Sequence, residues 1–115
     1  MKIAIFGANS HIAKDLIENF INETDYSLAL FSRYPEEITS WMLECGCKQG
    51  RFISTSYAEI DFREKYDLLI NFVGVGDPAS AKKMGAKIFE VTAKYDQLAL
   101  DYIQENKNCK YVFLS

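Results

Sequence analysis

The residues with the clearest chemical potential run from Gly7 to Ala13, Gly-Ala-Asn-Ser-His-Ile-Ala, directly after a short apolar segment. A dinucleotide site needs a tight turn at such a place, close approach of the backbone to the pyrophosphate, and a helix N-terminus directed at it. Gly7 can supply the turn, and Ser10 stands where a second glycine is usual, with a hydroxyl that can donate to a phosphate. Ala13 takes the third glycine position, where close helix–strand packing also admits alanine. The predicted pyrophosphate-binding residues are Gly7, Asn9, Ser10, His11, Ile12 and Ala13.

The same turn has an interpretation without a ligand. Gly7 would then serve only for its backbone freedom, and Asn9 or Ser10 would cap the following helix. The strand pattern before the turn and the helix pattern after it favour binding. His11 has no visible partner for general-base catalysis, so we expect it on the surface at the start of the helix.

The end of the second apolar segment, Ser32-Arg33, bears on the choice of cofactor. An NAD site has an acidic residue near this point for the ribose 2′-hydroxyl, whereas an NADP site uses arginine. Arg33 can pair bidentately with a 2′-phosphate, and Ser32 can add a hydrogen bond. The pattern favours NADP, with NAD as the alternative; a solvated surface charge is the simpler interpretation of Arg33.

Apolar periodicity predicts the elements that must position these residues. Apolar residues at helical spacing, such as Ile12, Leu16, Ile17, Phe20 and Ile21, indicate a helix face directed at the core. A later stretch has the same spacing at Ile88, Val91, Tyr95, Leu98 and Tyr102. Pro35 suits the first turn of a helix and Gly46 its end. Strands are predicted at residues 2–6, 27–32, 51–56, 66–73 and 110–114, and helices at 11–22, 35–44 and 78–106.

Strands that alternate with helices predict an α/β protein with a doubly wound parallel sheet of the Rossmann type. The 115 residues fit one domain spanning 1–115. Because no helix follows the fifth strand, we expect the domain to be truncated after that strand and to be the N-terminal fragment of a longer protein.

Composition and charge limit the classes of partner that the protein is expected to bind. The net charge of -3 and the scattered basic residues argue against nucleic acid as a partner. No apolar run reaches the ~20 residues of a membrane span, and no signal peptide precedes the first strand, so we expect a cytoplasmic protein. The three cysteines, Cys45, Cys47 and Cys109, are expected to be reduced thiols rather than zinc ligands.

Four segments in register resemble the short-chain dehydrogenase/reductase superfamily. Residues 6–13 are similar to its first turn, G-A-x-G-x-I-G in the extended and atypical epimerase/dehydratase-like branch. Residues 30–35 are similar to the end of its second strand, 70–74 to V-I-N-L-A-G, and 110–115 to K-F-V-Y-I-S. The resemblance implies that Val73 and Gly74 line the ribose, that the catalytic Tyr-x-x-x-Lys lies downstream, and that this part alone is catalytically inert.

The resemblance leaves two functions open. One is the NAD(P)-binding domain of an epimerase, dehydratase or reductase acting on a nucleotide sugar, with the helix after the fourth strand contributing to a homodimer. The other is a non-catalytic, NADP-sensing regulatory module of the atypical branch. A receiver-type domain is disfavoured because glycine, rather than clustered acids, follows the first strand.

Overall fold

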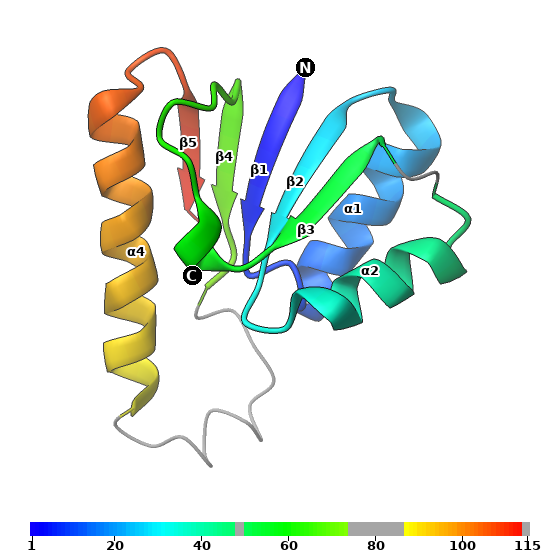
Figure 1. The fold of residues 1–115 in the computed structure, drawn as a ribbon, viewed down its shortest axis with the longest axis horizontal. Helices are drawn as coiled ribbons and strands as arrows, with labels where there is room; N and C mark the ends of the chain where they lie inside the picture. Colours follow the sequence, from blue (N-terminus) through cyan, green and yellow to red (C-terminus); the bar gives the residue numbers. More distant parts are fainter. Residues whose placement is uncertain (48–49, 74–86, 114–115) are drawn as a thin grey trace.

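Five parallel strands form one sheet in the computed structural model, which describes residues 1–47, 50–73 and 87–113, and only the backbone of 87–93. The spatial order is β3-β2-β1-β4-β5, and all the arrowheads point to the same edge (Figure 1). This confirms the predicted α/β class with a parallel, Rossmann-like sheet. The strands are β1 (Lys2–Phe6), β2 (Ser27–Phe31), β3 (Phe52–Thr55), β4 (Leu68–Asn71) and β5 (Lys110–Phe113).

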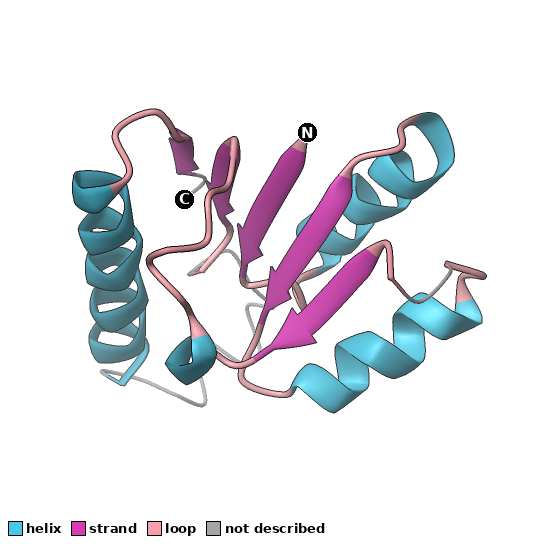
Figure 2. Ribbon diagram, turned by 45° about the horizontal axis from the view of Figure 1, so that its top comes forward, coloured by secondary structure: helices cyan, strands magenta, loops and turns pink. Residues whose placement is uncertain are grey.

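Helices cover both faces of the sheet. Helices α1 (His11–Glu23) and α2 (Pro35–Glu44) pack on one face, while α4 (Lys87–Glu105) and the short 3₁₀ helix η1 (Tyr57–Glu59) lie on the other (Figure 2). The predicted double winding is therefore confirmed. Residues 78–86 of the long predicted helix lie outside the described residues. None of the described helices combines the length and apolar character that a membrane crossing requires.

Helix α2 begins and ends where local chemistry predicts. Pro35 occupies the first turn, where its missing amide costs nothing, and acidic residues follow it at the positive end of the helix. At the other end Gly46 has φ +80°. The amide of Gly46 donates to Leu43 O and that of Cys47 to Met42 O, the two bonds of a Schellman motif.

Alternate strand residues divide the core into two layers. In β1, Ile3 and Ile5 face α1 and α2, whereas Ala4 and Phe6 face α4, and all four are fully buried. The prediction that Ile12 belongs to the buried face of α1 is wrong, because its side chain is 54% exposed. It lies in the first turn of the helix, next to the edge where the strands end, while Ala13 and Ile17 are buried against the sheet and Leu16, Phe20 and Ile21 pack beside them.

Arg51 holds the C-terminal end of α1. Its guanidinium donates to the carbonyl oxygens of Phe20 and Ile21, each at 2.8 Å, and also to those of Thr24 and Tyr26. The last carbonyls of a helix have no partner within it, and they carry the negative end of the helix dipole. One planar side chain therefore satisfies several acceptors and joins α1 to the start of β3.

Replacing Arg51 by lysine keeps the charge but removes the fork of donors. We expect Arg51→Lys to lower the free energy of unfolding by about 1–3 kcal/mol, measured by urea denaturation. Arg63→Lys is the matched control, because Arg63 is exposed, pairs with nearby Asp61, and should change stability by less than about 0.5 kcal/mol. Equal effects of the two substitutions would contradict the capping role of Arg51.

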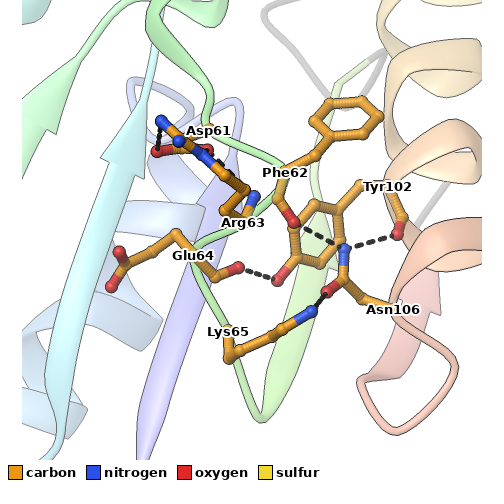
Figure 3. A network of polar contacts seen from close by, with 7 residues as sticks. All are labelled: Asp61, Phe62, Arg63, Glu64, Lys65, Tyr102 and Asn106. Atoms are coloured by element: carbon orange, nitrogen blue, oxygen red, sulfur yellow. Dashed lines mark hydrogen bonds and ion pairs between the residues drawn. The ribbon is translucent and has the colours of Figure 1, made fainter.

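Side chains of α4 and of Asn106, the residue directly after it, bond to the connection between β3 and β4, which contains only η1 (Figure 3). The hydroxyl of Tyr102 donates to Glu64 O at 2.6 Å and accepts from the amide of Tyr66 at 3.0 Å. The Asn106 amide group donates to Phe62 O at 3.1 Å. These side-chain hydrogen bonds satisfy backbone groups that a helix in the connection would otherwise pair. The connection therefore has a defined path across the sheet.

Burial of the aromatic layer predicts loss of stability in alkali. Burial raises the pKa of Tyr66 to about 12, whereas an unfolded tyrosine titrates near about 10. At a pH between these two pKa values, the unfolded chain binds fewer protons than the folded protein. The contribution of Tyr66 to the free energy of unfolding is therefore complete below pH of about 10 and falls by up to about 1.4 kcal/mol per pH unit above it. Urea unfolding between pH 9 and 12 should show a shallower decline for Tyr66→Phe than for the wild type. Parallel declines would contradict this assignment.

Candidate functional site

Three strand ends meet at the carboxyl edge of the sheet. In the parallel register Phe6 of β1 lies beside Phe31 of β2 and Asn71 of β4. From β1 the chain crosses to β2 through α1 on one face, whereas β4 leads to β5 through α4 on the other face. The boundary between β1 and β4 is therefore the topological switch point, the place where ligands bind in open α/β sheets.

Gly7 follows β1 and is required by the local geometry. Its φ is +74°, and a Cβ built on it would lie 3.0 Å from Phe72 C and from Val73 N. Its amide and that of Ala8 both donate to Phe31 O at 3.1 Å. The turn is therefore held against β2 and against the residues that follow β4. The backbones of the two predicted site residues Gly7 and Val73 lie close together.

Ser10 caps α1, as one of the two interpretations of the turn predicted. Its Oγ accepts a hydrogen bond from the amide of Ala13 at 3.1 Å, and its carbonyl accepts from the amide of Lys14 at 2.9 Å. Capping does not preclude binding, because the hydroxyl is the acceptor in this bond and keeps its hydrogen for another partner. Ala13 itself is fully buried against the sheet, in agreement with a role in close packing.

The first turn of α1 offers donors to solvent. The side chains of Asn9, His11 and Ile12 are exposed. Within the described part of the chain, the amides of His11 and Ile12 donate to no protein acceptor. These are helix N-terminal donors at the positive end of the dipole, so the arrangement fits an anionic group placed at this edge.

Ser32 and Arg33 lie beside this turn but differ in exposure. Ser32 is fully buried; its amide donates to Thr55 O at 3.2 Å, and its Oγ accepts from the amide of Tyr34 at 3.2 Å. Arg33 is exposed, with its guanidinium 5.8 Å from the centroid of the Tyr34 ring. Ser32 therefore shapes the turn that follows β2, while Arg33 is available to an anion.

Val73 is positioned by Asn71, the last residue of β4. The Asn71 Oδ1 accepts from the amide of Val73 at 2.9 Å, while its Nδ2 donates to Asp96 Oδ1 at 2.8 Å and to the Tyr111 hydroxyl at 3.1 Å. Asn71 is fully buried, so this set of bonds compensates its lost hydration. Gly74, also predicted to line the site, lies outside the described residues.

A cavity of about 570 Å³ opens between the ends of β2 and β3 and helix α4. Its lining includes Ser32 and Arg33 but none of the predicted residues of the glycine turn. Apolar and aromatic walls are combined with charges of both signs, including Lys94 and Asp101 from α4. Sequence reasoning placed Ser32 and Arg33 at this site but did not identify the contribution of α4.

Tyr57 begins η1, in a loop whose position the sequence pattern did not predict. Its hydroxyl accepts a hydrogen bond from the amide of Gly7 at 2.8 Å, and its ring stacks on Tyr95 with 3.9 Å between centroids. Burial raises the pKa of Tyr57, so the hydroxyl keeps its hydrogen at neutral pH. The one signal in the sequence is its position just after β3, at the same edge as the glycine turn.

Comparison with protein-family models and with curated proteins found no match for this sequence. Among the residues that the structure describes, no three or more His, Cys, Asp or Glu side chains are grouped as a metal site would require. The fold and the residues at the carboxyl edge of the sheet are therefore the features that indicate a function.

Two glycine substitutions separate backbone conformation from steric contact. Gly7 and Gly46 both have positive φ, but a Cβ at Gly46 would meet nothing within 4 Å. We expect Gly46→Ala to lower the free energy of unfolding by about 1–2 kcal/mol. Gly7→Ala should cost about 1–3 kcal/mol more, because the new Cβ would push against the backbone of Phe72 and Val73. Urea denaturation measures both, and equal losses would contradict the close approach at Gly7.

Proposed function

We propose that this chain is an NADP-binding domain, with the adenosine end of the cofactor in the cavity and its pyrophosphate at the start of α1. The observation that carries the proposal is the cavity beside Ser32 and Arg33, at the same edge of the sheet as the glycine turn. Its volume of about 570 Å³ lies within the range of roughly 300–1,000 Å³ typical of small-molecule sites.

The residues present fit the two ends of the cofactor. Tyr57 and Tyr95 provide apolar surface for a base, and Arg33 provides a planar fork of donors for a 2′-phosphate. No acidic residue stands at the end of β2, where an NAD site would use one for the ribose hydroxyls. The amides of His11 and Ile12, which have no acceptor among the described residues, suit the pyrophosphate.

The bound dinucleotide would supply hydride transfer, and the domain would supply its binding and orientation. The resemblance of four segments to the short-chain dehydrogenase/reductase superfamily supports assignment to an NAD(P)-dependent oxidoreductase, epimerase or dehydratase, with a nucleotide sugar as the proposed substrate. An NADP-sensing module would use the same site.

Calorimetric titration with NADPH and NADH tests the cofactor proposal. We expect NADPH to bind more tightly than NADH to the wild type. Arg33→Asp should weaken NADPH binding by about tenfold to a hundredfold, because a charge-assisted contact with the 2′-phosphate is replaced by repulsion. The same substitution should change NADH binding by less than about threefold.

Lys107→Asp is the matched control. It makes the same change of charge at an exposed position between α4 and β5, at the opposite edge of the sheet. NADPH binding should remain within about twofold of the wild type, because surface charges this far apart are screened. Binding of neither nucleotide by the wild type would overturn the proposed function. Preference for NADH would retain the site and reject the role of Arg33.

A further inference from the structure

Tyr57 belongs at the same time to the cavity and to the glycine turn. Its ring lines the cavity and stacks on Tyr95 of α4. The ring also packs edge-on against Phe6 at 5.2 Å between centroids and lies 6.2 Å from Phe31. Only 8% of the residue is exposed, so its position is set by packing on several sides.

The hydroxyl of Tyr57 reaches the turn across 50 residues of sequence. The amide of Gly7 is shared between this hydroxyl at 2.8 Å and Phe31 O at 3.1 Å. Each of the two acceptors limits how the Gly7 peptide plane can turn. The orientation of the Gly7 peptide in turn determines where the chain enters α1.

We infer that Tyr57 is a positioning residue that couples the two ends of the dinucleotide site: its ring walls the adenosine cavity, and its hydroxyl orients the glycine turn that presents α1 to the pyrophosphate. This inference rests on the proposed NADP site. It assigns Tyr57 an effect on ligands that place a phosphate at the turn, and little effect on ligands that occupy the cavity alone.

Tyr57→Phe tests this assignment because it keeps the ring and removes only the hydroxyl. Calorimetry would compare NADPH, which reaches the turn, with adenosine 2′-monophosphate, which has no group there. We expect the Kd for NADPH to rise about three- to tenfold, as for the loss of one buried hydrogen bond, and the Kd for the fragment to stay within about twofold. A merely structural role would weaken both ligands alike.

Tyr66→Phe is the control within the same aromatic layer. Tyr66 precedes β4 at the amino edge of the sheet, opposite the glycine turn, and is also buried. Removing the Tyr66 hydroxyl should leave the Kd for NADPH within about twofold of the wild-type value. An unchanged Kd for NADPH in Tyr57→Phe, or an equal loss for NADPH and the fragment, would overturn the coupling.

A measurement on the wild type decides the inference even if the variant folds poorly. In NMR titrations the fragment alone should shift the Gly7 amide resonance, because its contact with the Tyr57 ring changes the hydrogen bond to that amide. An unmoved resonance at saturation overturns the coupling, as does a fragment that does not bind the wild type. A wild type that binds neither ligand overturns the proposed function and this inference together, whereas NADPH binding without the coupling overturns the inference alone.

Discussion

The close approach of Gly7 to the backbone that directly follows β4 is the constraint on which the carboxyl edge depends. A Cβ at this position would lie only 3.0 Å from Phe72 C and Val73 N, so any other residue would have to shift the backbone that directly follows β4. The same turn is bonded to the carbonyl of Phe31 in β2. Because one peptide segment contacts both neighbouring strands, the start of α1, the end of β2 and the end of β4 lie together.

The second determinant is the short connection between β3 and β4. Only η1 interrupts it, so the α4 side of the sheet is covered incompletely near β3. Ile53 pairs with Ala29, which belongs to the layer facing α4, yet Ile53 is 54% exposed. Tyr57 of η1 stacks on Tyr95 of α4, and the cavity lies between these two helices.

The glycine turn and the cavity contribute different chemistry to the carboxyl edge of the sheet. The turn contributes backbone donors at a helix N-terminus, which suit an anion, while the cavity contributes aromatic surface with Arg33 at its margin. A ligand with a flat base, a phosphate near it and a second phosphate group farther along would use both. The hydrogen bond between Tyr57 and Gly7 is the direct physical link between the two parts.

Local patterns determined the elements. The sequence by itself predicted five strands in order and the bounds of α2, because strand and helix periods, Pro35 and Gly46 act within a few residues of the chain. It also predicted the glycine turn, whose chemistry lies in adjacent residues. Only the tertiary structure decided that Ile12 is exposed, that α4 lines a cavity with β2 and β3, and that Tyr57 bonds to Gly7. Those outcomes depend on which distant segments become neighbours, and contacts between segments far apart in the chain leave no periodic signal in one sequence.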